Sequence, residues 1–329
     1  MAIETELKLH LNPKDLDAFL SHPLLQSAGE KKQLFNTYYD TAAFDLHQQK
    51  MALRVRRKGD QWLQTIKHAN KSDYSLQRGE WEMPIDDNQL NFSLFPSAAL
   101  QGVLAFDEQR QQVKPVFTTD FLRTTWVLQD DEGNQLELCL DQGKVTAPNT
   151  KTEILIHEIE LELLQGQPHY LYEIALQLSQ KIPLVLGFGS KAKHGYTLIG
   201  NPPLVEAKPI AFVASDDNHS QFFEDIFKQS VQQIYANHIA AKQADNQGLH
   251  LFSLSFATLH HLFSRYPQHY LSKKLHSDCA IILKQCQLLQ QQLGLNHFLP
   301  VSQQEKLDPE ILFSGRTYNH FLLKIGALD

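Results

Sequence analysis

The strongest constraint on the fold is an alternation of charged and apolar residues in many short segments of residues 1–200. The first such segment, residues 3–9, reads Ile-Glu-Thr-Glu-Leu-Lys-Leu. Successive residues of a β-strand point to opposite faces, so Glu4, Glu6 and Lys8 share one face of this predicted strand. The same alternation predicts further strands, giving the set 2–10, 33–39, 51–58, 61–68, 76–84, 115–128, 134–141 and 154–164.

Turn and cap residues separate these strands. Asp-Glu-Gly-Asn at 131–134 predicts a turn between the sixth and seventh strands. Asp-Gln-Gly-Lys at 141–144 predicts that the seventh strand ends in a second turn. Helices are expected at 13–21, where Asn12 and Pro13 provide a cap and a first-turn proline, and at 168–182.

The charged faces of the strands carry clusters of like sign. Arg54 and Arg56 share one face, and Glu158, Glu160 and Glu162 share another. A solvated sheet face often explains polar positions of this kind, but like charges on a shared face repel one another. A closed barrel with a polar lumen accounts for both the acid-rich strands (first, seventh and eighth) and the base-rich strands (third and fourth).

A lumen with these charges predicts a particular chemistry. Clustered carboxylates favour a hard divalent cation with oxygen ligands. Clustered arginine and lysine favour an anion with several oxygens, and phosphate suits the guanidinium fork. A metal ion and a phosphate in one cavity is the arrangement used for phosphoryl transfer to water.

The apolar pattern changes near residues 201–217, which we interpret as a linker because Asn-Pro-Pro at 201–203 interrupts regular structure. From about residue 218 the apolar period is 3.6 residues, which indicates helices. Four helices are expected, within 222–239, 249–263, 271–289 and 311–325, and a four-helix bundle is their natural packing.

Composition excludes several classes of protein. The chain has 30 Lys and Arg against 37 Asp and Glu, and residues 201–329 hold 10 and 11 of these. Neither part has the basic bias of a nucleic-acid-binding protein. No apolar run reaches the ~20 residues that a membrane-spanning helix needs. The acidic N-terminus does not resemble a secretory signal, and three cysteines without a C-x-x-C pair favour the cytoplasm.

The order of the charged motifs resembles the CYTH superfamily, the triphosphate tunnel metalloenzymes. Glu4-x-Glu6-x-Lys8 is similar to the E-x-E-x-K signature of that family. It is followed by Tyr-Tyr-Asp-Thr at 38–41, Leu-Arg-Val-Arg at 53–56, Thr-Ile-Lys at 65–67, Phe-Leu-Arg at 121–123, the acidic strand at 158–162, and Ser-Lys at 190–191. Residues 118–123 and 140–144 look closest to bacterial inorganic triphosphatases that carry a C-terminal CHAD domain.

The resemblance implies an α+β protein in two domains. Residues 1–200 are expected to form an eight-stranded antiparallel β-barrel, the triphosphate tunnel. Residues 201–217 are the expected linker, and residues 218–329 form an all-α four-helix bundle that resembles a reduced CHAD domain. CHAD domains are associated with polyphosphate, but this part is short and its charges nearly balance, so we expect weak polyphosphate binding at most.

The resemblance also implies roles for individual residues. Those expected to take part in catalysis are Glu6, Lys8 and Glu160. Those expected to hold Mg²⁺ or Mn²⁺ are Glu4, Glu6, Glu158 and Glu160. Those expected to bind substrate phosphates are Lys8, Arg54, Arg56, Lys67, Arg78, Arg123 and Lys191. Further tunnel acids are Glu80, Glu82, Glu137, Asp141 and Glu162.

The activity implied by the resemblance is hydrolysis of inorganic triphosphate to diphosphate and phosphate. Two alternatives remain. One is hydrolysis or cyclisation of an organic triphosphate, such as thiamine triphosphate or a nucleoside triphosphate, although the sequence shows no evident base-recognition pocket. The other is a non-catalytic polyphosphate-binding protein, although carboxylates that repel the ligand would not help pure anion binding.

Overall fold

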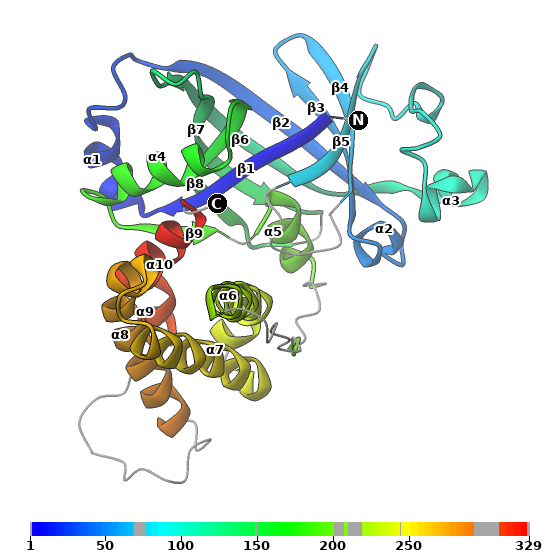
Figure 1. Ribbon diagram of the computed structural model, residues 1–329. Helices are drawn as coiled ribbons and strands as arrows, with labels where there is room; N and C mark the ends of the chain where they lie inside the picture. The colour runs from blue at the N-terminus through cyan, green and yellow to red at the C-terminus, as the bar shows by residue number, and fades with distance from the viewer. Residues whose placement is uncertain are drawn as a thin grey trace. The chain divides into compact units, whose positions relative to one another are not determined.

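A computed structural model describes residues 2–68, 77–148, 150–187, 189–200, 207–209, 219–243, 245–292 and 309–327. The chain divides into two compact units, Met1–Pro203 and Leu204–Leu328. We call them the strand unit and the helical unit, and each is described by itself (Figure 1). The expected domain limits, 1–200 and 218–329, stay predictions. Most of the expected linker, 201–217, lies outside the described residues.

In the described part of the strand unit, nine strands form one antiparallel sheet. Their order across the sheet is β5-β4-β3-β2-β6-β7-β8-β1-β9, and β1 also pairs with β5. The strands are β1 (Ala2–Leu11), β2 (Glu30–Asp40), β3 (Met51–Lys58), β4 (Gln61–His68), β5 (Gln77–Ile85), β6 (Lys114–Gln129), β7 (Gln135–Thr146), β8 (Ile154–Gln165) and β9 (Leu184–Gly187).

The alternation predicted β1 to β8 to within a few residues at most ends, but it missed one strand and placed one turn wrongly. β9 was not predicted, because a strand of only four residues carries too little alternation to recognise. The seventh strand does not turn at 141–144 but continues to Thr146. Gly143 lies opposite Phe121 of β6, and a Cβ at this position would lie 2.1 Å from the carbonyl oxygen of Asp120. The glycine therefore serves a close approach of β6 and β7, not a turn.

Strand β1 has three partners. Its residues 2–5 pair with β5, residues 6–10 with β8, and residues 8–11 with β9. The fold is therefore α+β with a large antiparallel sheet, as expected. The closed eight-stranded barrel is not established, because the sheet has nine strands and β1 meets β5 only over residues 2–5.

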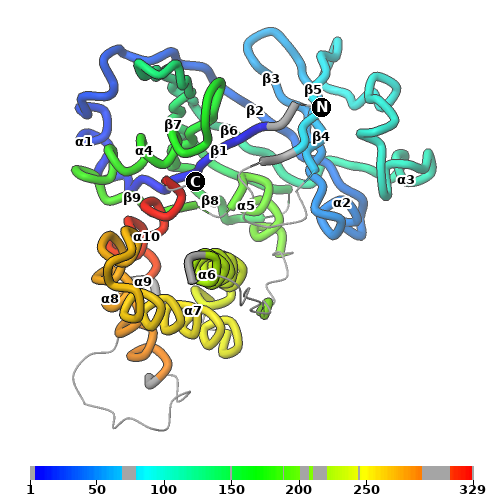
Figure 2. The backbone as a smooth tube through the Cα atoms, in the orientation of Figure 1, coloured from blue at the N-terminus to red at the C-terminus, as the bar shows by residue number. Residues whose placement is uncertain are grey.

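Helices and irregular segments cover the apolar face of the sheet. Helix α4 (His169–Ser179) contacts β1 and β8 and buries Leu171 and Leu178. The segment between β5 and β6 packs Phe95 and Leu104 against Leu53 of β3. The backbone course of this segment can be followed in Figure 2. This segment contains the short helices η2 (Phe92–Leu94), η3 (Gly102–Ala105) and α3 (Asp107–Gln112). Helix 13–21 was predicted and forms as η1 (Pro13–Asp15) and α1 (Leu16–Leu20), and α2 (Asp45–Gln48) follows β2.

Helix α5 (Lys191–Leu198) lies on the other face of the sheet. Its Ala192 and Tyr196 pack with Leu34, Phe121 and Ile156 of β2, β6 and β8, in a cluster with Tyr38, Phe117 and Val145. Strand residues separated by an even number of positions share a face. Each of these strand residues has that spacing from a predicted charged residue or from the residue paired with one, so α5 packs on the face that carries the predicted charges. The sequence folds α5 here because Ser190 caps the helix, accepting a hydrogen bond from the Lys193 amide at 3.2 Å.

The described part of the helical unit has five helices, α6 (His219–Lys242), α7 (Asn246–Arg265), α8 (Tyr270–Gln292), α9 (Pro309–Ser314) and α10 (Arg316–Gly326). The first three were predicted. The predicted fourth helix, 311–325, is wrong as a single helix, because Gly315 has an extended backbone and separates α9 from α10. Phe252, Phe256 and Tyr318 form an aromatic core. Among the described residues, no helix is long and apolar enough to cross a membrane.

Candidate active site

The strand register brings the predicted site residues of the strand unit to one face of the sheet. Glu160 lies opposite Lys8, and Glu162 lies opposite Glu6. Directly paired residues of adjacent strands lie on the same face. Following the pairings across the sheet, the residues on this charged face are Glu4, Glu6, Lys8, Arg54, Arg56, Lys67, Glu80, Glu82, Arg123, Glu137, Asp141, Glu158, Glu160 and Glu162.

Lys191 enters this face from the start of α5 and contacts three carboxylates. Its Nζ lies 2.6 Å from Asp141, 2.5 Å from Glu158 and 2.9 Å from Glu160. Burial by itself would lower the pKa of Lys191, but these three acids raise it well above the usual value. Lys191 is therefore a permanent cation, held where α5 meets the charged face.

Arg123 of β6 binds the next part of the same acidic group. Its Nε and Nη2 donate to the two oxygens of Asp141 at 2.7 and 2.6 Å, and Nη2 also donates to Glu160. Asp141 is completely buried. Burial opposes the charge on Arg123, but Glu160 and Asp141 raise its pKa well above the usual value. This two-pronged contact fixes the guanidinium plane.

The predicted catalytic residues form a connected chain of charges. Lys8 donates to Glu6 at 2.7 Å and also to Glu160. Burial would lower the pKa of Lys8, and Glu160 and Glu6 raise it above its usual value. Burial would likewise raise the pKa of Glu160, but Lys191, Lys8 and Arg123 hold it well below the usual value. Lys8 thus joins Glu6 and Glu160 in one network, in which Lys8 and Glu160 are held in their charged forms.

A second network joins β1, β3, β4 and β5. Lys67 contacts Glu4 at 2.5 Å and Glu80 at 3.3 Å. Arg54 lies 3.4 Å from Glu80 and 3.9 Å from Glu82. Burial lowers the pKa of Arg54, but Tyr38 and then Glu80 outweigh it and raise the pKa. This network places two of the predicted phosphate-binding cations beside acids of β1 and β5.

Arg56 differs from the other cations of the charged face. Among the described residues it has no carboxylate at ion-pair distance, and its Nε donates to the amide oxygen of Asn36 at 2.8 Å. Burial and then the charges of Arg54 and Arg123 lower the pKa of Arg56 to about 10, and Tyr38 and Glu82 oppose them only in part. Arg56 is therefore a cation in a positive environment that an anion would relieve.

Four acids lie close together around Glu162. Burial and the neighbouring Glu4, Glu137 and Glu6 raise the pKa of Glu162 to about 7, and Lys67 opposes them in part. These four acids come from β1, β7 and β8, and Glu4 and Glu6 also contact Lys67 and Lys8. A bound cation would offset the repulsion among the four acids.

Three buried carboxylates of the charged face form a group that could hold a divalent cation. Asp141, Glu158 and Glu160 each offer a carboxylate oxygen, and these oxygens lie within 4.8 Å of one another. All three residues are buried. An all-oxygen, multiply charged set suits a hard cation such as Mg²⁺ or Mn²⁺. Glu158 and Glu160 were predicted as metal ligands, Asp141 only as a further tunnel acid, and Glu4 and Glu6 are not in this group of three.

One predicted residue has a side chain that is not described, and two residues of the charged face were not predicted. The side chain of Arg78 lies outside the described residues, although its backbone pairs with Glu4. Asn36 and Thr119 lie on the charged face and were not predicted. The signal that could have found Asn36 is its spacing in the second strand, two residues from Tyr38, because that places it opposite Arg56 in the hairpin.

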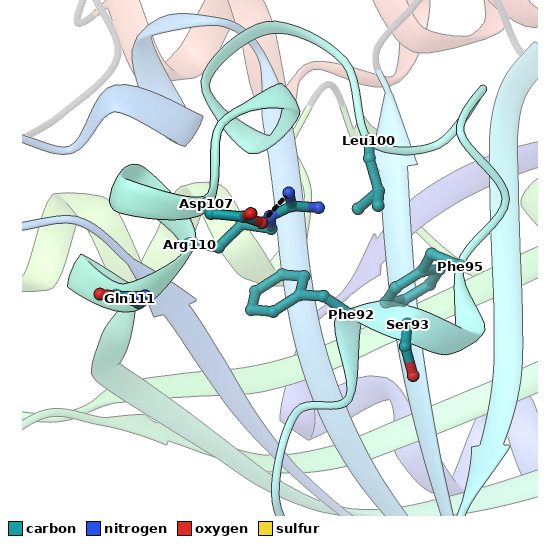
Figure 3. A pocket seen from close by; sticks show the side chains of 7 residues that line it. All are labelled: Phe92, Ser93, Phe95, Leu100, Asp107, Arg110 and Gln111. Atoms are coloured by element: carbon teal, nitrogen blue, oxygen red, sulfur yellow. Dashed lines mark hydrogen bonds and ion pairs between the residues drawn. The ribbon is translucent and has the colours of Figure 1, made fainter.

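A cavity of about 540 Å³ lies elsewhere in the strand unit (Figure 3). The segment between β5 and β6 forms it, on the apolar side of the sheet. Asp107 and Arg110 at its edge pair with each other. None of the predicted site residues lines this cavity, so the charged face is the candidate active site. The lining residues are Phe92, Ser93, Phe95, Leu100, Asp107, Arg110 and Gln111.

The sheet and its charged face define a class of protein. Residues 2–196 match the CYTH domain family, and the chain belongs to that family. The match ends before the helical unit, so a CHAD-like domain at 218–329 stays a prediction.

A more particular relative is an inorganic triphosphatase of Haemophilus influenzae. It is 32% identical over 205 residues, which cover 60% of this chain and 55% of the relative. The chain thus spans about half the length of this curated relative. Two solved structures are also similar: a putative adenylyl cyclase from Hippeastrum, described as having a dominant triphosphatase activity (23% identity, 62% of this chain, 98% of that chain, TM-score 0.42), and a putative adenylate cyclase from Bacillus halodurans (22%, 55%, 94%, TM-score 0.36).

Proposed function

We propose that this protein hydrolyses inorganic triphosphate to diphosphate and phosphate in a metal-dependent reaction. The observation that carries the proposal is the charged face of the sheet, where buried and partly buried cations from β1, β3, β4, β6 and α5 meet buried and partly buried carboxylates from β1, β5, β7 and β8. A polyphosphate anion and a divalent cation are the two ligands that such a mixture suits. The similarity to an inorganic triphosphatase supports the choice of substrate.

In this proposal the sheet closes into a tunnel and the charged face lines its lumen. Support comes from the sequence of pairings, which leads from β1 through β5, β4, β3, β2, β6, β7 and β8 back to β1. Helix α5 then lies at one end of the lumen, since it packs on the charged face through Tyr196 and Ala192. A lumen of this kind excludes bulk water and strengthens every charge interaction inside it.

The predicted residues then have three roles: binding phosphate, holding the metal ion and orienting water. Lys8, Arg54, Arg56, Lys67, Arg123 and Lys191 bind phosphate oxygens, and the arginines stabilise charge that develops on the transferred phosphoryl group. Glu4, Glu6, Glu158 and Glu160, joined by Asp141, hold Mg²⁺ or Mn²⁺. When bound, the divalent ion neutralises charge on the phosphoryl oxygens. Glu6 and Glu160, which Lys8 bridges, orient the attacking water.

The helical unit and the location of the protein complete the proposal. We assign residues 218–329 to a reduced CHAD-like domain that binds long-chain polyphosphate weakly at most, which its nearly balanced charges support. A cytoplasmic location fits the three cysteines, which are all buried and free.

The test is release of phosphate from inorganic triphosphate by the purified protein with Mg²⁺, with Mn²⁺ and with EDTA. We expect rapid release with at least one metal, none with EDTA, and slower release from ATP and from long-chain polyphosphate. Intact triphosphate with both metals contradicts the proposal. Faster turnover of ATP than of triphosphate contradicts the assigned substrate.

A further inference from the structure

The six predicted phosphate-binding cations whose side chains the structure describes fall into two kinds. Lys8, Lys67, Lys191, Arg54 and Arg123 each contact at least one carboxylate. Arg56 contacts none among the described residues and is oriented by a neutral amide instead. In the absence of substrate, five cations are therefore engaged by acids, whereas the two Nη groups of Arg56 have no acceptor in the described part of the chain.

The orientation of Arg56 depends on a short chain of side chains across three strands. Asn36 of β2 lies directly opposite Arg56 of β3 and directly opposite Thr119 of β6. Arg56 Nε donates to Asn36 Oδ1 at 2.8 Å, and Asn36 Nδ2 donates to Thr119 Oγ1 at 2.8 Å. Asn36 and Thr119 are both 0% exposed. Arg56 Nε can only donate, so the amide presents its oxygen to Arg56 and its Nδ2 to the Thr119 hydroxyl, which holds the far end of the amide.

The chemistry of this contact is unusual for the site. A carboxylate at position 36 would hold the guanidinium equally well and would also neutralise it. The amide fixes Nε without adding charge, and Arg54 and Arg123 make the surroundings of Arg56 more positive. The full charge of Arg56 thus stays available for an anion.

We propose that Asn36 is a positioning residue for triphosphate binding. Thr119 orients Asn36, and Asn36 in turn holds Arg56 as the unneutralised cation that receives a substrate phosphate. This inference rests on the proposed function for its ligand. It adds that Arg56 binds the anion without first losing an acidic partner, whereas Lys8, Lys67, Arg54, Arg123 and Lys191 must exchange carboxylate for phosphate. Asn36 does not touch the substrate in this proposal.

The experiment uses the full chain and compares Asn36→Asp with the wild type. The dissociation constant of inorganic triphosphate is measured by titration calorimetry in EDTA, where turnover is absent, and the melting temperature is measured without ligand. The added carboxylate pairs with Arg56, so we expect triphosphate binding to weaken about tenfold or more. The melting temperature should be unchanged or higher, because a buried cation gains a partner.

The opposite signs of these two effects separate positioning from a merely structural role. A dissociation constant within about twofold of the wild type overturns the inference, as does weaker binding that accompanies a lower melting temperature. The matched control is Gln33→Glu, which exchanges an amide for a carboxylate on the same strand, at an exposed site where Gln33 binds Asp120. It should leave triphosphate binding unchanged.

A second pair of variants keeps the inference testable if Asn36→Asp does not fold. Thr119→Val removes the acceptor that orients Asn36 and adds no charge, and we expect it to weaken binding severalfold. Thr119→Ser keeps the hydroxyl and should bind as the wild type does. Thr118→Val is the control on the same strand. The Thr118 hydroxyl lies on the face of the sheet opposite to the charged face, where it shares a hydrogen bond of 2.9 Å with the Thr146 hydroxyl. Equal binding by Thr119→Val and the wild type overturns the inference.

The outcome for this inference is distinct from the outcome for the proposed function. Wild-type protein that binds triphosphate without hydrolysing it contradicts the function, while the effect of Asn36→Asp on binding still tests the inference. Wild-type protein that hydrolyses triphosphate and is unaffected by Asn36→Asp retains the function and removes the role of Asn36.

Discussion

At the scale of single residues, the charged face contains acids and bases that are unequally compensated. Glu160 contacts three cations, and its pKa lies well below the usual value despite burial. Glu162, two residues along the same strand, lies among Glu4, Glu137 and Glu6 and has a pKa near 7. One strand therefore carries both a carboxylate whose pKa is lowered and one whose pKa is raised.

Glu162 gives the metal-free protein a defined dependence on pH. Its pKa is raised from 4.5 to about 7 on folding, so the folded state binds the proton more tightly than the unfolded state. The stability that this provides is present below pH 4.5 and is lost as the pH rises towards 7. In EDTA, Glu162→Gln should therefore raise the urea midpoint at pH 8 and change it little at pH 4.5. A constant difference between the two proteins at both pH values would contradict this assignment.

At the scale of elements, the decisive piece is α5, because it brings Lys191 to the charged face. Gly195 makes its packing possible: a Cβ there would lie 2.1 to 2.4 Å from ring atoms of Phe117. That ring cannot give way, since it is buried and stacks on Tyr38 with 4.8 Å between centroids. Close packing thus fixes where the helix starts, and with it the position of Lys191.

Gly195→Ala should displace α5. We expect a loss of about 1 to 3 kcal/mol in the free energy of unfolding, as for other overpacked cores, and a raised KM for triphosphate because Lys191 moves. Chemical denaturation and steady-state kinetics measure the two effects. Gly189→Ala is the control just before α5, where an added Cβ makes only ordinary contacts at 3.7 Å. Wild-type stability and KM in Gly195→Ala would show that α5 tolerates the methyl group.

The elements also show how far sequence reasoning reaches. Alternation predicted β1 to β8 and the shared face of Glu4, Glu6 and Lys8, because the period of a strand is a local property. It did not predict β9 or the course of β7 past Gly143, which depend on approach between distant strands. Nor could it show that Arg56 lacks an acidic partner within the described part of the chain, because the choice of partner depends on the register of three strands.

At the scale of the whole molecule, the chain is two compact units with separate cores. The family match, the charged face and α5 all belong to the strand unit. The helical unit has its own aromatic core, in which Phe252, Phe256 and Tyr318 are completely buried. The proposed chemistry therefore depends on the strand unit alone.

A fragment of residues 1–203 is accordingly expected to fold and to hydrolyse triphosphate at a rate within about threefold of the full chain, since a compact domain with its own core can fold independently. Thermal unfolding and phosphate release test this. Adding the fragment 204–329 back at equal concentration is the control. A folded but inactive fragment 1–203 that regains activity on this addition would assign the helical unit a part in catalysis.

The contacts of Lys191 have a consequence for how the two proposed ligands act together. Lys191 contacts Asp141, Glu158 and Glu160, the same three carboxylates that suit a cation. In the proposed reaction, triphosphate that draws Lys191 away would free these acids for the metal, and a metal that takes the acids would free Lys191 for triphosphate. We therefore expect the two ligands to bind with positive cooperativity, each raising the affinity for the other by the same factor.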